Sequence, residues 1–182
     1  MIRTAVLIMI GVALASAQSQ PTQDHEAMLN ERGDQVMGFS HLKTTHHFEL
    51  KYDGGIIDAR ANDAGDTESR DQIRTHFRHI VRLFAEGNFN APMLVHSTDV
   101  PGTGTMARLK DQIHWDLEDT PRGARIKITA DNQAALDAVH DFLRFQIEDH
   151  KTGDCEAVHE TLWSRQVASL ILTPFAHSQG KP

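Results

Sequence analysis

The chain has 182 residues and a formal net charge of −7, with 18 basic against 25 acidic side chains. This acidic balance argues against a nucleic-acid partner, because nucleic-acid binding needs a basic footprint. The single cysteine, Cys155, excludes an intramolecular disulfide, and the 12 histidines let the surface charge change in mildly acidic solution.

The N-terminus has the features of a secretory signal peptide. Arg3 gives a basic start, residues 5–15 form an apolar run, and small residues including Ala17 precede a cleavage point before Gln18. The run is shorter than the roughly 20 residues that cross a bilayer. We therefore expect residues 1–17 to be removed, no membrane span, and a mature protein that is periplasmic or secreted.

Residues 18–37 are polar and lack a regular apolar period, which predicts a flexible lead-in with a short helical piece around residues 25–32. Alternating apolar and polar side chains then predict a strand over residues 44–52. The turn sequence DGG at 53–55 leads to a returning strand that ends near Asn62.

A helix is predicted from Asp66 to Gly87, because apolar side chains recur there at spacings of three and four. A loop with Pro92 and Pro101 follows. Its sequence PGTGTMARLKD lacks the Gly-Lys-Ser/Thr of a phosphate-binding loop, so we interpret it as a loop leading into a short helical turn.

The second half of the chain repeats this order. Alternation over residues 113–117 and 124–130, with a turn at 120–123, predicts a second hairpin. A second helix is predicted over residues 132–150, and residues 156–172 form a further amphipathic helix candidate.

The order ββα, loop, ββα indicates an internal duplication, and HFEL at 47–50 against HWDL at 114–117 is its best local sign. We predict an α+β domain over residues 38–154. Its duplicated ββα units form a four-stranded antiparallel sheet with two helices on one face. Residues 155–182 are a C-terminal extension.

Several histidines are candidate metal ligands between this sheet and the helices. Neutral imidazole is the commonest ligand for zinc, copper and nickel, and three or four converging nitrogens make a site. The candidate set is His46, His76 and His140, with His79 or His96 assisting. The alternative, and the commoner role of a histidine in an apolar stripe, is a hydrogen bond to the backbone or to a buried carboxylate.

Neighbouring strand residues point to opposite faces of a sheet, so His46 and His47 cannot serve one site. His47 and its repeat partner His114 would approach each other on the open face if the two halves pair around a pseudo-two-fold axis. The alternative is a solvated sheet face, where both histidines stand among charged neighbours.

The segments TTHHF, DTESRDQIRTHFRHI, IHWDLEDTPRGARIKI and AVHDFLRFQIEDHKTGD resemble a family of small exported bacterial proteins without an established activity. The resemblance covers residues 31–154. Some relatives carry the name transcarbamylase, but this chain lacks the Ser-Thr-Arg-Thr phosphate loop of those enzymes.

Three functions stay open on the sequence. The first is an exported binding protein that holds a transition metal such as zinc or copper, or a small ligand, through a histidine cluster. The second is a structural or protein-interaction module without a cofactor, and the third is an exported hydrolase that uses a metal or a His/Asp site. We favour a protein that is not an enzyme, because the chain has no Gly-x-Ser-x-Gly elbow and no phosphate loop.

Overall fold

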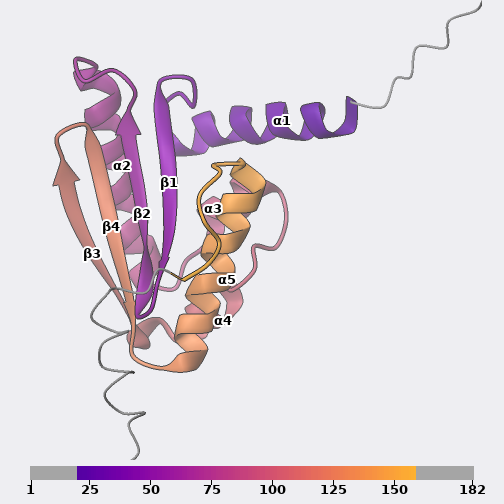
Figure 1. The fold of residues 1–182 in the computed structure, drawn as a ribbon, viewed down its shortest axis with the longest axis vertical. Helices are drawn as coiled ribbons and strands as arrows, with labels where there is room; N and C mark the ends of the chain where they lie inside the picture. The colour runs from indigo at the N-terminus through magenta and orange to yellow at the C-terminus, as the bar shows by residue number, and fades with distance from the viewer. Residues whose placement is uncertain (1–19, 159–182) are drawn as a thin grey trace, which may run out of the picture.

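The computed structural model describes residues 20–158, and their side chains from Asp24 onward. It confirms the predicted α+β class (Figure 1). In chain order the elements are α1 (Gln20–Met37), β1 (Thr44–Lys51), β2 (Gly54–Ala61), α2 (Thr67–Ala85), α3 (Asn90–His96), α4 (Thr103–Arg108), the 3-10 turn η1 (Lys110–Gln112), β3 (Ile113–Thr120), β4 (Gly123–Ala130) and α5 (Gln133–His150).

The four strands form one antiparallel sheet in the order β1-β2-β4-β3. The two hairpins meet at its centre, where β2 pairs with β4 and Ile57 lies opposite Ile126. Phe48 and Leu50 of β1 share a face with these residues, because alternate strand residues point the same way. The predicted four-stranded antiparallel sheet is therefore confirmed.

Both long helices cover this apolar face. α2 packs mostly on β4 and β3, whereas α5 packs on β1 and on the central strands. Each helix thus reaches the edge strand of the other ββα unit, and the buried side chains of both units form one core. The two units cannot separate without exposing this core, so the duplicated region is a single domain.

Side-chain caps fix where the two long helices begin. The carboxylate of Asp66 accepts a hydrogen bond from the Ser69 N–H at the start of α2, and the Asn132 side chain accepts one from the Ala135 N–H at the start of α5. Such caps satisfy N–H groups that have no partner within the helix. The predicted helix starts are confirmed at both places.

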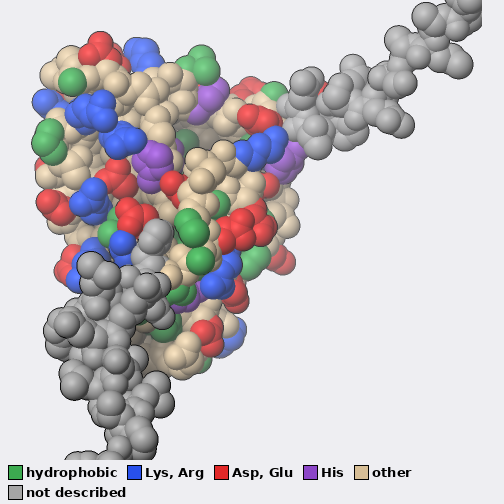
Figure 2. Space-filling view, in the orientation of Figure 1, with side chains coloured by type: hydrophobic (Ala, Val, Ile, Leu, Met, Phe, Trp, Pro, Cys, Tyr) green, Lys and Arg blue, Asp and Glu red, His purple; other side chains and the backbone are tan. Residues whose placement is uncertain are grey.

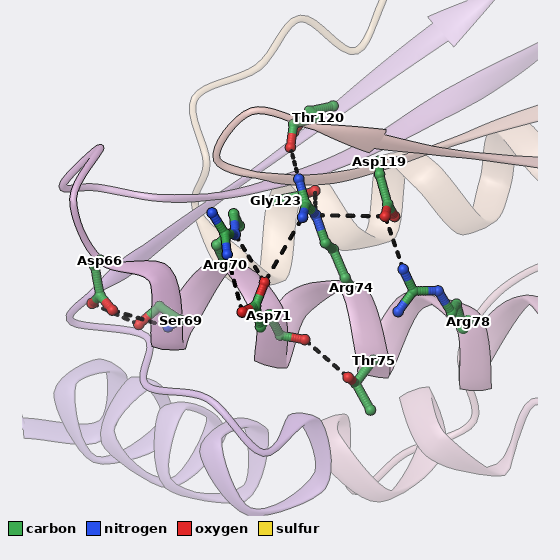
Figure 3. A network of polar contacts seen from close by, with 10 residues as sticks. All are labelled: Asp66, Ser69, Arg70, Asp71, Arg74, Thr75, Arg78, Asp119, Thr120 and Gly123. Atoms are coloured by element: carbon green, nitrogen blue, oxygen red, sulfur yellow. Dashed lines mark hydrogen bonds and ion pairs between the residues drawn. The ribbon is translucent and has the colours of Figure 1, made fainter.

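Arginines of α2 tie the helix to the β3–β4 hairpin (Figure 3). The Arg74 guanidinium donates to the Gly123 carbonyl at 3.0 Å and also to the Thr120 carbonyl. One turn later Arg78 donates to the Asp119 carboxylate at 2.8 Å. These hydrogen bonds connect the two ββα units, as the shared core does, because a helix of the first unit binds the hairpin of the second.

Helix α1 is longer than the short helical piece expected around residues 25–32, and it extends away from the body of the domain (Figure 1). Leu29 is its anchor, at 1% exposure. Arg32 donates to the Val95 carbonyl of α3 at 2.7 Å, and Lys151 forms an ion pair with Glu26 at 2.7 Å. α3 itself was expected to be loop.

After α5 the chain returns to the outer edge of the sheet. The Asp154 carboxylate accepts hydrogen bonds of 2.9 Å from the Phe48 N–H and from Nδ1 of His47, both in β1. Cys155 follows and is exposed. Of the helix candidate over residues 156–172, residues 156–158 are not helical, and those from His159 onward lie outside the described residues.

On the visible face, acidic and basic side chains of the described residues are intermixed, with histidines between them (Figure 2). Among the helices of residues 20–158, none has the length and apolar character needed to cross a bilayer.

Leu143 of α5 is fully buried, so shortening its side chain should leave a cavity in the core. We expect Leu143→Ala to lower the free energy of unfolding by about 2–5 kcal/mol, because the lost methyl groups leave a void that the neighbours fill only in part. Leu42→Ala is the matched control, since Leu42 is 77% exposed, and it should change the same quantity by less than about 0.5 kcal/mol. Urea unfolding followed by circular dichroism measures both, and equal losses would contradict the assignment of the core.

Candidate functional site

A cavity that is partly open to solvent lies between the apolar face of the sheet and the helices that cover it. Its volume is about 90 Å³, several times the roughly 10–15 Å³ that one water molecule needs. Strands β1, β2 and β4 line one side, and α2, α3, α5 and the end of α1 line the others. Most lining side chains are apolar. The polar ones are His46, His76, His96, Gln146 and His150.

Ordinary periodicity brings these polar residues together. His46 lies on the apolar face of β1, and His76 borders the buried stripe of α2. On α5, Phe142, Gln146 and His150 follow one another at the four-residue spacing of one helix face. The cavity wall therefore becomes more polar along α5, from Phe142 to His150.

The imidazoles at the polar end pack against other rings. The His46 ring stacks on Phe39 and on His150, with centroids 5.7 Å and 6.3 Å away. The His76 ring meets Phe39 at 5.6 Å, and the His150 and His96 rings are 4.9 Å apart. His76, Phe39, His46, His150 and His96 thus form a continuous row of rings.

Burial lowers the pKa of the His46 and His76 imidazoles to about 4 and that of His150 to about 3. Repulsion from neighbouring imidazoles lowers each pKa further, and at His150 the Asp149 carboxylate opposes the shift only in part. A histidine with so low a pKa is neutral at pH 7. The three rings therefore present uncharged nitrogen atoms.

In the part of the chain that the structure describes, the ring nitrogens of His46, His76 and His150 have no hydrogen-bond partner. The histidine hydrogen bonds of residues 24–158 involve other members, namely His25, His41, His47, His79, His96, His114 and His140. The three residues are half-buried, so these nitrogens remain open to water or to a molecule in the cavity.

His96 differs, because a carboxylate binds one of its ring nitrogens. Its side chain is 1% exposed, and Nδ1 donates to Asp149 at 2.5 Å. The other Asp149 oxygen accepts a hydrogen bond of 2.9 Å from Nε2 of His25 on α1. Burial raises the pKa of the Asp149 carboxyl, but the hydrogen bonds from the two histidines outweigh it and the pKa is lowered. An ionised Asp149 therefore joins α1, α3 and α5.

Gln146 places an unpaired amide atom in the cavity wall. Gln146 is 5% exposed, and its Oε1 is 3.2 Å from Nε2 of His96. Nε2 of Gln146 has no partner among the described residues. If His96 is neutral, its Nε2 accepts and the amide turns its NH2 group toward the ring, which leaves the amide oxygen unpaired instead. One amide atom of Gln146 lacks a partner in either case.

Two of the predicted metal ligands lie away from this cavity. His140 is buried, and its Nε2 lies 2.9 Å and 3.0 Å from the carbonyl oxygens of Lys51 and Gly54, to which it donates. It therefore ties α5 to the β1–β2 turn, which is the backbone-bonded role that the sequence left as the alternative. His79 is exposed on the outer side of α2.

The other three predicted ligands, His46, His76 and His96, do line the cavity. No group of three or more histidine, cysteine, aspartate or glutamate side chains within the described residues is arranged to hold a metal ion. The geometry thus brings imidazoles to one cavity without directing their nitrogens to one point.

Sequence reasoning missed His150 and Gln146. The signal was present, because both continue the buried stripe of α5 at the same spacing as Val139 and Leu143. A stripe traced only through its apolar members ends at Ile147 and omits the polar positions that make the site.

The expected approach of His47 to His114 is wrong. β1 and β3 are the two edges of the sheet, three strand spacings or about 14 Å apart. The hairpin registers make Thr44 equivalent to Ile113, so His47 corresponds to Asp116. Each histidine instead binds its own carboxylate, Asp154 at 2.9 Å for His47 and Asp131 at 2.9 Å for His114.

Comparison of the sequence with models of protein families, with characterised proteins and with solved structures found no match.

The lowered pKa values predict a loss of stability in mild acid. In the unfolded chain these histidines have a pKa near 6.5 and bind protons below it, whereas the folded protein keeps them neutral down to about pH 4. The unfolded state then holds more protons, so the free energy of unfolding falls as the pH drops from 6.5 toward 4, by about 1.4 kcal/mol per pH unit for each histidine. Urea unfolding at several pH values measures the slope. His150→Phe should make it shallower, and parallel curves for the variant and the wild type would contradict the assignment.

The bridge at Asp149 predicts that the attachment of α1 depends on this carboxylate. Asp149→Asn keeps the shape but removes the charge that pairs with His25 and His96, and hydrogen bonds to a charged group are worth about 1.5–3 kcal/mol. We expect amide hydrogen exchange in α1 to become at least about tenfold faster. Asp141→Asn is the matched control, on the exposed side of the same helix. Unchanged exchange in Asp149→Asn would show that the apolar contact of Leu29 alone holds α1.

Proposed function

We propose that the protein is an exported binding protein and that the cavity described above holds a small, uncharged and largely apolar molecule. The observation that carries the proposal is the set of three imidazoles, His46, His76 and His150, which face one apolar cavity without hydrogen-bond partners among the described residues. Export rests on the leader-like sequence of residues 1–17.

A ligand explains an arrangement that is costly without one. A polar group taken out of water without a hydrogen bond costs a few kcal/mol. In this cavity the group of that kind is the Gln146 amide, which is buried with one atom unpaired among the described residues. Binding sites for small molecules commonly have this composition, with an apolar lining and a few polar groups that fix the orientation. The site is also preformed, since its walls belong to the core of the domain.

The lining favours an uncharged ligand. His46, His76 and His150 are neutral at pH 7, so they offer no compensating charge, and the ionised Asp149 already has two histidine partners. An unpaired ion moved into such surroundings loses far more solvation energy than a neutral molecule does. The cavity volume of about 90 Å³ also restricts the ligand to a small molecule.

The test uses the full chain, expressed with its leader and recovered from the periplasm, where intact mass should give an N-terminus at Gln18. Phenol, toluene and indole are then titrated and the amide shifts of the cavity lining are followed by NMR. We expect dissociation constants of about 1 mM or tighter. Ala91→Leu should abolish binding because Ala91 lines the cavity. Ala27→Leu is the matched control, on the exposed side of α1.

Zinc and copper are titrated in parallel at pH 7.5. Stoichiometric metal binding that is lost in His46→Phe, together with no binding of the aromatic probes, would replace the proposed ligand by a transition metal. A protein that keeps residues 1–17 in the cytoplasm would refute export.

A further inference from the structure

The neutral imidazoles restrict the ligand further, and this step rests on the proposed function. Each neutral imidazole carries one N–H donor and one acceptor nitrogen. His46, His76 and His150 together therefore offer donors and acceptors in equal number. Gln146 adds an amide atom without a partner, within a side chain enclosed by the core.

The polar groups lie at one end of the cavity. On α5 the lining runs from Phe142 to His150 over eight residues, or about 12 Å of helix. α2 shows the same gradient in the opposite chain direction, with Phe84 near Phe142 at 6.1 Å between rings and His76 at the other end near Phe39. A ligand that matches both walls has an apolar body at the phenylalanine end and a polar head at the histidine end.

The head group must both donate and accept hydrogen bonds. A carboxylate or phosphate only accepts and an ammonium only donates, so either would leave part of the imidazole nitrogens unpaired, besides bringing a charge into an apolar cavity. A hydroxyl group does both with one oxygen atom. An apolar group would leave all of the nitrogens unpaired.

We propose that the cavity binds a small hydroxyl compound, an alcohol or a phenol, with its hydroxyl group at the end lined by His46 and His150 and its hydrocarbon part against Phe84 and Phe142. The rings of His46 and His150 are stacked with centroids 6.3 Å apart, and both line the cavity. Gln146 lies one helical turn before His150 on the same wall of α5.

The test compares phenol with toluene, benzoate and benzylamine in the full-length mature chain. Phenol and toluene have the same size and differ in one group. A purely apolar cavity binds toluene more tightly, because it would bury the phenol hydroxyl without a partner. Here we expect phenol to bind at least about tenfold more tightly than toluene, and benzoate and benzylamine more weakly than phenol.

Two ring-preserving variants locate the effect. His150→Phe and His46→Phe should each weaken phenol binding by about tenfold while toluene binding holds or improves, because each removes hydrogen-bonding nitrogens and keeps an aromatic ring. His114→Phe is the matched control, since His114 is on the opposite face of the sheet. Two variants are used so that a failure of one to fold leaves the other informative.

The outcomes separate the two proposals. If toluene binds as tightly as phenol or more tightly, or if benzoate binds most tightly of all, the hydroxyl assignment is overturned while the cavity remains a binding site. If both variants keep the wild-type preference for phenol over toluene, the hydroxyl group does not contact His46 or His150, and the assignment is also overturned. No binding of any probe would overturn the proposed function itself.

Discussion

The pairing of β2 with β4 is the constraint on which the rest of the structure depends. It joins the two ββα units at the centre of the sheet and sends β1 and β3 to opposite edges. Because each helix then reaches the edge strand of the other unit, neither unit has a core of its own. The same arrangement leaves a space between α2, α5 and the sheet, which α3 and the end of α1 border. The cavity is therefore a product of the topology and not of a single loop.

Desolvation decides the chemistry of that space. A histidine in water is protonated at mildly acidic pH, but enclosure by Phe39, Phe48 and neighbouring imidazoles keeps His46 and His150 neutral. The protein supplies a carboxylate to only one member of the row, His96, and directs that carboxylate to a residue of α1 as well. Charge is thus placed where helices are joined, and uncharged nitrogen atoms are left where a ligand can bind. The proposed site would thus give up stability in exchange for binding groups, as functional sites commonly do.

Local signals predicted the local structure well. The hairpin turns, the caps at Asp66 and Asn132 and the apolar stripes all depend on residues close in sequence, and the elements they predicted are those observed. Non-local features were less accessible. A sequence repeat does not specify strand order, so the prediction that His114 lies next to His47 was wrong. The role of His140 was decided by a turn 86 residues away in the chain. His46, His76 and His96 do line the cavity, but whether nitrogens meet at one point depends on rotamers that no spacing determines.

The contact of Asp154 with β1 also affects how the molecule behaves among its own copies. An edge strand presents unpaired N–H and C=O groups that can pair with a strand of another chain, and this is a common route to aggregation. The Asp154 carboxylate occupies the Phe48 N–H and places a negative charge beside the strand. At the other edge, β3 carries Asp116, Glu118 and Asp119. Both open edges of the sheet therefore carry charged side chains, and a second copy that paired with either edge would have to remove these charges from water.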